Sequence, residues 1–301
     1  MDLYGLQDYY KYYLKECLCF PSFTLLSIIY LIFFNFIKNS LNAFCRLLSQ
    51  LFYAIIYKAY LRMLKGGARV KNKKTIKQLL SEYKHGVILS YFFIYLIWFF
   101  LLEHTVTTKY HVIHCKLDDL IPFNEVFVIP YFLWFAYIFV TVAYFFLTSK
   151  KDFYKCCAYL FTGMTICLII YTIFPNGTGT QLRVDLDSLG RKNIFITILS
   201  RLYSFDTATN VFPSIHVFNS VGALIAINKS ERLHKMKWLQ WSAFTLTILI
   251  CLSTVFLKQH SVMDIFGALV LNIIMYFIVY VPSWVRFTKE TKQTKRELSN
   301  I

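Results

Sequence analysis

Residues 253–284 read STVFLKQHSVMDIFGALVLNIIMYFIVYVPSW, which joins a candidate catalytic motif to a long apolar segment. The segment Ile265–Trp284 contains no charged side chain. A helix needs about 20 such residues to cross the hydrocarbon core of a bilayer. His260 and Asp264 stand just before this segment, and their i, i+4 spacing places both side chains on one face of a helix. The stretch therefore predicts a membrane-spanning helix with a titratable pair at its mouth.

Similar apolar segments recur along the chain, in which 57% of the residues are hydrophobic. Long segments with so few charges are not typical of a soluble globular protein. The predicted fold is all-α: a polytopic membrane protein with a six-helix transmembrane bundle and an N-terminal apolar, interfacial helical extension. The six predicted spans are Gly86–Leu102, Val126–Leu147, Cys156–Phe174, Val211–Asn228, Trp238–Leu257 and Ile265–Trp284.

The chain before the bundle contains two further apolar segments. Phe20–Ile37 is long enough to cross a membrane. Leu41–Leu64 carries three basic residues, so we expect it to lie in the interface. The predicted regions are a membrane-associated extension (residues 1–84), the bundle (residues 85–285) and a charged cytoplasmic tail (residues 286–301).

The basic residues indicate how the bundle is oriented. Much of the net charge of +16 comes from the connections Lys65–Lys84, Lys150–Lys155 and Lys229–Lys237 and from the tail Arg286–Arg296. All four lie on one side of the predicted bundle, which the positive-inside rule makes cytoplasmic. We expect anionic lipids as partners of these loops, and no nucleic acid, because the basic residues form no single stripe interleaved with aromatics. The richness in Lys, Ile, Asn, Phe and Tyr is typical of an AT-rich genome, so we expect a bacterial plasma membrane.

A second histidine motif, Pro213-Ser214-Ile215-His216, reaches the same non-cytoplasmic face when the crossings are counted. With Pro213 in the first helical turn, the N–H groups of the next three residues would point at an anion. A turn-rich segment ending at Arg183 would add a planar guanidinium suited to phosphate. The predicted catalytic residues are His260, His216 and Asp264, and the predicted phosphate-binding residues are Arg183, Ser214 and Ile215.

These two motifs resemble a known family. Pro213-Ser214-Ile215-His216 and Ser253-x6-His260-x3-Asp264 look like the second and third signature motifs of the type 2 phosphatidic acid phosphatase and vanadium haloperoxidase superfamily. The resemblance covers residues 85–285, and the bulky Ile215 is similar to the inositol phosphorylceramide synthase-like branch. The resemblance implies that His260 forms a phosphohistidine, Asp264 orients it, and His216 protonates the leaving oxygen and later activates the acceptor. It also implies that the reaction needs no metal or cofactor.

Two positions depart from the family pattern. Arg183 is followed by Val184 instead of proline, and no lysine lies between Pro175 and Arg183. Thr254 stands where the phosphatases carry arginine, which removes one guanidinium and favours a transferase. Three other cations are candidates to replace it: Lys258, Arg191 and Arg201.

The predicted function is lipid-phosphate hydrolysis, with a membrane phospholipid or a polyprenyl (di)phosphate as substrate and water as acceptor. With a lipid alcohol as acceptor, the same chemistry would make the protein a headgroup phosphotransferase similar to inositol phosphorylceramide or sphingomyelin synthases. A transporter that senses protons with the two histidines is a third hypothesis. The predicted spans hold few charged residues at mid-depth, where a translocation pathway usually needs them.

Simpler interpretations exist for several of these residues. Asp264 could be a helix-end carboxylate, Ser214 a helix cap, and Arg183 a partner of Asp185 or Asp187. The first outer loop also holds six potential metal ligands, but their spacing matches no standard zinc pattern, so we predict no metal site. These six residues are His104, His111, His114, Cys115, Asp118 and Asp119.

Overall fold

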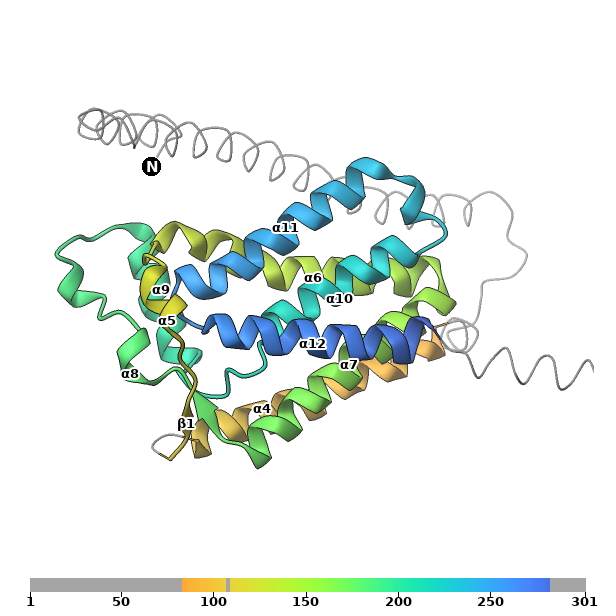
Figure 1. Cartoon of the computed structure of the whole chain (residues 1–301). Coiled ribbons are helices and arrows are strands. Elements are labelled where there is room, and N and C mark those ends of the chain that lie inside the picture. Colours follow the sequence, from red (N-terminus) through yellow and green to blue (C-terminus); the bar gives the residue numbers. More distant parts are fainter. Residues whose placement is uncertain (1–82, 107–108, 282–301) are drawn as a thin grey trace, which may run out of the picture. The chain divides into compact units, whose positions relative to one another are not determined.

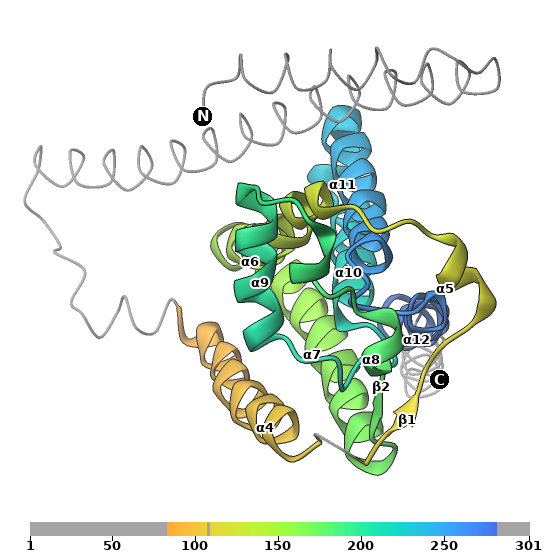
Figure 2. The same ribbon diagram turned by 90° about the vertical axis from the view of Figure 1, so that its left-hand side faces the viewer.

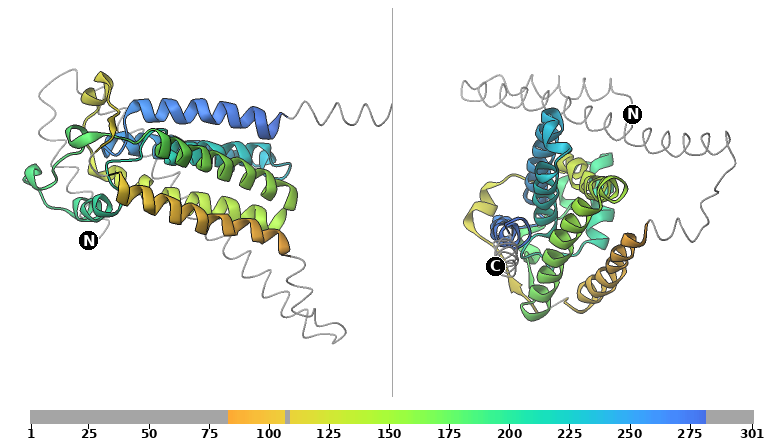
Figure 3. Two further views of the ribbon diagram at one scale, coloured as in Figure 1. Left: turned by 90° about the horizontal axis from the view of Figure 1, so that it is seen from below. Right: turned by 90° about the vertical axis from the view of Figure 1, so that its right-hand side faces the viewer.

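The computed structural model describes residues 83–106 and 109–281, all within the compact unit Val70–Ile301. The predicted segments Phe20–Ile37 and Leu41–Leu64 and the tail 286–301 lie outside the described residues. The long helices run side by side, and the loops with α5, α8 and α9 gather at one end of them (Figures 1 and 3). The elements are η1 (Lys84–Ser90), α4 (Tyr91–Thr105), β1 (His111–Val112), α5 (Lys116–Leu120), η2 (Glu125–Phe127), α6 (Val128–Thr148), α7 (Lys150–Ile173), β2 (Asn176–Gly177), α8 (Gly179–Leu182), η3 (Asp187–Leu189), α9 (Ile194–Phe205), α10 (Ile215–Lys229), η4 (Leu233–Lys235), α11 (Lys237–Phe256) and α12 (Val262–Tyr280).

Five helical segments in the described part of the chain are long and apolar enough to cross a membrane. They are Lys84–Thr105, Glu125–Thr148, Lys150–Ile173, Lys237–Phe256 and Val262–Tyr280. Large apolar side chains are exposed along α4, α6 and α12, as expected of helices that face lipid. The prediction of a helical, multi-pass integral membrane protein is therefore confirmed, with the short parallel pair β1 and β2 as an addition.

The predicted span Val211–Asn228 is not confirmed as a membrane-spanning helix. Ser214 has extended backbone and caps α10, so the helix begins at Ile215 and Pro213 lies before it instead of in its first turn. The 15 residues of α10 extend about 22 Å, which is short of a hydrocarbon core about 30 Å thick. The helix lies among α6, α7, α11 and α12 (Figure 2), so its short length exposes no backbone to lipid.

A close contact between α7 and α10 brings these two helices together. A Cβ atom at Gly163 would lie 1.9 Å from the ring of Phe218, and one at Gly222 would lie 2.8 Å from the ring of Tyr159. Any larger residue at either position would push the helices apart. Small residues at such crossings are typical of membrane helix packing.

The irregular segment before α10 is held by one buried side chain. The Asn176 carboxamide oxygen accepts the N–H groups of Val211 (2.9 Å) and Phe212 (2.7 Å). Its NH2 group donates to the carbonyl oxygens of Phe174 (2.8 Å) and Phe212 (3.2 Å). Non-helical backbone inside a membrane protein is tolerated only where such partners exist. Asn176 therefore fixes the segment that leads into the Pro-Ser-x-His motif.

The loops at this end of the bundle are also joined to the helices. β1 pairs with β2 in parallel, with His111 opposite Asn176. The amphipathic helix α9 packs Leu199 and Leu202 against Val128 and Tyr131 at the start of α6. These contacts bring the chain around Arg183 to the mouth of the bundle.

Candidate active site

His260 lies in the loop between α11 and α12. Its Nδ1 atom is 3.1 Å from the carbonyl oxygen of Val211 and 3.1 Å from a carboxylate oxygen of Asp264. A carbonyl oxygen can only accept a hydrogen bond, so these neighbours assign the proton to Nδ1. The lone pair of His260 is then on Nε2. The arrangement leaves Nε2 as the ring atom that could act as a nucleophile.

Asp264 is fully buried in the first turn of α12. The same carboxylate oxygen that contacts His260 accepts the N–H of Ser261 at 2.9 Å. This bond is half of a capping box, in which Ser261 caps the helix and Asp264 reaches back to it. The capping role and the contact with the histidine therefore belong to one carboxylate.

His216 is the second residue of α10, and its ring faces the ring of His260. The two ring centroids are 5.7 Å apart in an edge-to-face arrangement. On its other sides His216 contacts the rings of Tyr131 and Trp134, with centroid distances of 4.5 and 4.4 Å. The structure therefore brings the two predicted histidines together across a sequence separation of 44 residues (216 to 260).

Arg183 lies directly after α8, beside the loop that carries His260. Its guanidinium donates to the side-chain oxygen of Gln259, the neighbour of His260, and to the carbonyl oxygen of Asp206 at 2.7 Å. The guanidinium also stacks on the ring of Tyr203, 4.3 Å from its centroid. Arg183 thus lies next to the loop that carries His260. Its partners are not Asp185 or Asp187, the acidic residues that the sequence suggested.

Ser214 and Ile215 occupy the start of α10. The Ser214 hydroxyl accepts the N–H of Val217 at 3.4 Å, and the Ser214 N–H donates to the carbonyl oxygen of Asp264 at 3.2 Å. Ser214 therefore acts as a cap and joins α10 to α12, while its predicted contact with phosphate stays a prediction. The N–H groups of Ile215 and His216 lie in the first helical turn, where the helix itself supplies no acceptor.

Two of the three cations proposed to compensate for Thr254, Lys258 and Arg191, have other contacts. The Lys258 ammonium donates to the carbonyl oxygens of Asp118 and Ile121, each at 2.6 Å. Burial lowers the pKa of Lys258 although nearby carboxylates oppose this. Arg191 donates to Glu125 at 2.7 Å. Lys258 and Arg191 therefore anchor loops in this structure.

Thr254 itself contributes through its backbone. Its carbonyl oxygen accepts the N–H groups of both Gln259 and His260 at 3.0 Å. The side chain of Thr254 is fully buried. This position therefore shapes the turn that carries His260 and holds no guanidinium.

The sequence analysis did not predict the roles of several residues at this site. Asn176 positions Val211, whose carbonyl oxygen accepts the His260 proton, and the carboxylate of Asp118 reaches Ser261. Tyr131, which lines His216, donates to the carboxylate of Asp206. The only signals in the sequence are that Asn176 starts an Asn-Gly pair and that Asp118 is one of a pair of acidic residues.

No group of three or more His, Cys, Asp and Glu residues that could hold a metal ion occurs among the described residues. The candidate ligands of the first outer loop have separate partners. His114 pairs with Asp119 at 2.9 Å, His111 stacks on Phe174, and Asp118 contacts Ser261.

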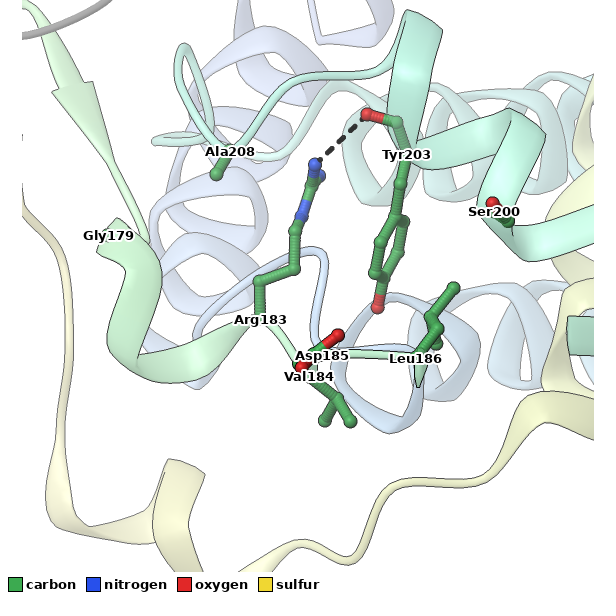
Figure 4. A pocket seen from close by; sticks show the side chains of 8 residues that line it. All are labelled: Gly179, Arg183, Val184, Asp185, Leu186, Ser200, Tyr203 and Ala208. Atoms are coloured by element: carbon green, nitrogen blue, oxygen red, sulfur yellow. Dashed lines mark hydrogen bonds between the residues drawn. The ribbon is translucent and has the colours of Figure 1, made fainter. Parts of the chain in front are cut away.

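Arg183 is one of the residues that line a cavity of about 350 Å³ (Figure 4). Its walls come from the segment that follows α8 and from α9, and they are mostly apolar. Its lining residues are Gly179, Arg183, Val184, Asp185, Leu186, Ser200, Tyr203 and Ala208. His216 and His260 do not line it, whereas Arg183 both lines it and contacts Gln259, the neighbour of His260.

Comparison with known proteins finds one family. The model of the PAP2 superfamily matches residues 188–287, about a third of the chain. The matched region contains Ser214, His216, His260 and Asp264, while Arg183 precedes it. No curated protein and no solved structure matched the chain. The resemblance seen in the two motifs is thus confirmed over residues 188–287, and the inositol phosphorylceramide synthase-like branch stays a prediction.

Proposed function

We propose, starting from the PAP2 superfamily match over residues 188–287, that the protein is a membrane lipid phosphate phosphatase that uses a phosphohistidine intermediate. The observation that carries the proposal is the pair of acceptors on His260 Nδ1, which leaves the lone pair on Nε2, in a ring whose centroid is 5.7 Å from that of His216. A nucleophile oriented by a carboxylate, with a second titratable ring beside it, is the arrangement that covalent catalysis requires.

In the first half-reaction, His260 Nε2 attacks the phosphorus of a lipid phosphoester. The N–P bond forms, the bond between phosphorus and the leaving oxygen breaks, and His216 donates a proton to that oxygen. The phosphorylated His260 ring is cationic because Nδ1 keeps its proton. The buried carboxylate of Asp264, 3.1 Å away, stabilises that charge.

In the second half-reaction, His216 takes a proton from water, which attacks the phosphohistidine. The O–P bond forms, the N–P bond breaks, and inorganic phosphate leaves with His260 restored. General acid and base catalysis by one group in two directions follows from microscopic reversibility. His216 therefore both donates the proton to the leaving oxygen and takes the proton from water.

The phosphate oxygens need donors while charge builds up on them. The N–H groups of Ile215 and His216 at the start of α10 are suited to this role, because a helix N-terminus favours an anion. Arg183 supplies a cation beside Gln259, the neighbour of the nucleophile. Backbone donors of this kind stabilise a transition state without reorganising.

The substrate that fits this position is a lipid. The site lies where loops and helix ends meet at one end of a bundle that spans the membrane, and a mostly apolar cavity adjoins Arg183 (Figures 3 and 4). We therefore place a membrane phospholipid or polyprenyl phosphate there. The other end carries the basic connections at Lys150 and Lys229, which supports a cytoplasmic location for that end and binding of anionic lipids there.

A headgroup phosphotransferase is the second candidate. The observation in its favour is Thr254, a buried residue where phosphatases of the family carry arginine. One fewer guanidinium weakens the hold on free phosphate, and this matters less if a lipid alcohol accepts the phosphoryl group.

The test is turnover of a mixed phospholipid panel by purified protein in liposomes with EDTA, following free phosphate and new lipids together. We expect free phosphate that is lost in His260→Ala and retained in His104→Ala, which changes an exposed histidine on α4. A new phospholipid without free phosphate would establish the transferase. Full turnover by His260→Ala would overturn the phosphohistidine mechanism.

A further inference from the structure

Asp118 is a buried carboxylate in a loop that has no sequence relation to the catalytic motifs. It belongs to α5, between the first two spans, and is 2% exposed. Its carboxylate accepts the Ser261 hydroxyl at 2.6 Å and the N–H of Val262 at 2.8 Å, 143 and 144 residues further along the chain. We propose that Asp118 is a positioning residue that holds His260 and Asp264 in their reactive arrangement through Ser261.

One residue holds the catalytic loop at both of its ends. The carbonyl oxygen of Asp118 accepts the ammonium of Lys258 at 2.6 Å, while its carboxylate holds Ser261 and Val262. His260 lies between these two anchors. Any movement of α5 is therefore passed to the loop that carries the nucleophile.

Ser261 relays this hold to the catalytic pair. Its hydroxyl donates to Asp118, and its N–H donates at 2.9 Å to the carboxylate oxygen of Asp264 that also contacts His260 Nδ1. The side chain of Ser261 is thus held by the carboxylate of Asp118, and its backbone N–H by the carboxylate of Asp264. If the hydroxyl lost its acceptor, the Ser261 peptide could turn and the Asp264 carboxylate would lose the donor that holds it.

The charge of Asp118 suits this role. Burial alone would raise its pKa, but hydrogen bonds from Ser261, Val262 and Cys115 outweigh burial and lower the pKa below its usual range. The side chain is therefore a carboxylate at neutral pH and accepts all three donors. An asparagine in its place would turn an NH2 group towards at least one of them.

A purely local role for Asp118 makes a different prediction. Its carboxylate also accepts the N–H of Cys115 at 2.8 Å and so completes the capping box of α5. If this were its only role, replacement would reduce the amount of folded protein without changing the turnover of each folded molecule. The positioning role predicts lower turnover in molecules that remain folded.

The experiment compares Asp118→Asn with Asp119→Asn in the full chain. Asp119 is the adjacent residue, is exposed, and pairs with His114 at the surface. Asp119→Asn therefore makes the same substitution at a side chain that does not bond to Ser261 or Val262. For each variant, kcat and KM towards the lipid that the wild type hydrolyses are measured and normalised to the folded fraction. This arm rests on the proposed function. In Asp118→Asn we expect kcat to fall by about 100-fold, as for a small misplacement of a reacting group, while KM stays unchanged. In Asp119→Asn we expect both kcat and KM to stay at the wild-type values.

A double-mutant cycle with Ser261→Ala isolates the contact. Two residues that act through one hydrogen bond are not additive, so the double variant should be no slower than the slower single variant. Effects on kcat that multiply would overturn the inference. Unchanged kcat per folded molecule in Asp118→Asn would overturn it as well, and would leave Asp118 with the capping role alone.

Hydrogen exchange supplies a readout that does not depend on turnover. The backbone amides of residues 261–263 should exchange faster in Asp118→Asn than in the wild type or in Asp119→Asn, because the asparagine NH2 group faces either Val262 or Ser261 and one of these two donors loses its acceptor. If the wild type hydrolyses no lipid but this difference appears, the proposed function fails and the structural link stands. If exchange is unchanged, the link itself is refuted.

Discussion

Replacement of Asn176 by alanine should be among the most damaging single changes at this site. The buried carboxamide makes four hydrogen bonds to the backbone, two as acceptor and two as donor. At about 0.5–1.5 kcal/mol each, their loss should lower the free energy of unfolding by about 2–6 kcal/mol. That is a large part of the typical stability of a domain, about 5–15 kcal/mol.

The same change should also disable the chemistry, because Asn176 holds Val211, whose carbonyl oxygen accepts the His260 proton. The assay is reversible unfolding in mixed micelles, with lipid turnover measured on the folded fraction. Asn193→Ala is the matched control. Asn193 also lies in an outer loop but makes two side-chain hydrogen bonds, so we expect about half the loss of stability and normal turnover. A loss below about 1 kcal/mol for Asn176→Ala, or one equal to that of Asn193→Ala, would refute the reasoning.

Three further predictions concern the histidines, the helix cap and pH. His216→Ala should still form an acid-labile phosphohistidine from an aryl phosphate, because that leaving group needs no proton. Hydrolysis of the phosphohistidine should be about 10²–10⁴-fold slower than in the wild type. A quenched-flow experiment that detects no phosphoenzyme would contradict this. Ser214→Ala should cost about 1 kcal/mol of stability and leave the Kd for orthovanadate unchanged, whereas weaker vanadate binding would favour the predicted phosphate contact. Because the folded-state pKa of Asp118 is lowered, its contribution to stability is present above the unfolded-state value near 4 and is lost as pH falls through the lower folded-state value. Melting curves between pH 3 and 6 should therefore show an acid-induced loss in the wild type that is smaller in Asp118→Asn.

The sequence predicts the long helices and the catalytic pair well, for local reasons. Apolar length alone indicates α6, α7, α11 and α12. His260 and Asp264 are in contact as the i, i+4 spacing predicts, but not on one helical face, because α12 begins at Val262 and His260 lies in the loop before it. Both signals lie within one segment of chain. They also place the active-site histidines at one end of the bundle, where the structure has them.

Long-range contacts account for what the sequence does not predict. The bond of Asp118 to Ser261 spans 143 residues, and that of Asn176 to Val211 spans 35, so no periodicity or motif spacing reports either one. The length of α10 is a different case. Apolar residues precede Ile215, but Ser214 caps α10 and the helix begins only at Ile215, so the predicted span counted Val211–Ser214 as helix when they lie outside it.

The short central helix has a consequence for which molecules reach the site. If the cytoplasmic end of α10 is level with its neighbours, its other end lies about 8 Å inside the hydrocarbon boundary, the difference between its length and the membrane thickness. A lipid phosphate can reach that depth with its chains still in the bilayer, whereas a water-soluble phosphate ester must descend into the opening without that anchor. We expect the recess to act as a filter that distinguishes substrates by where they partition, before any side chain distinguishes their headgroups.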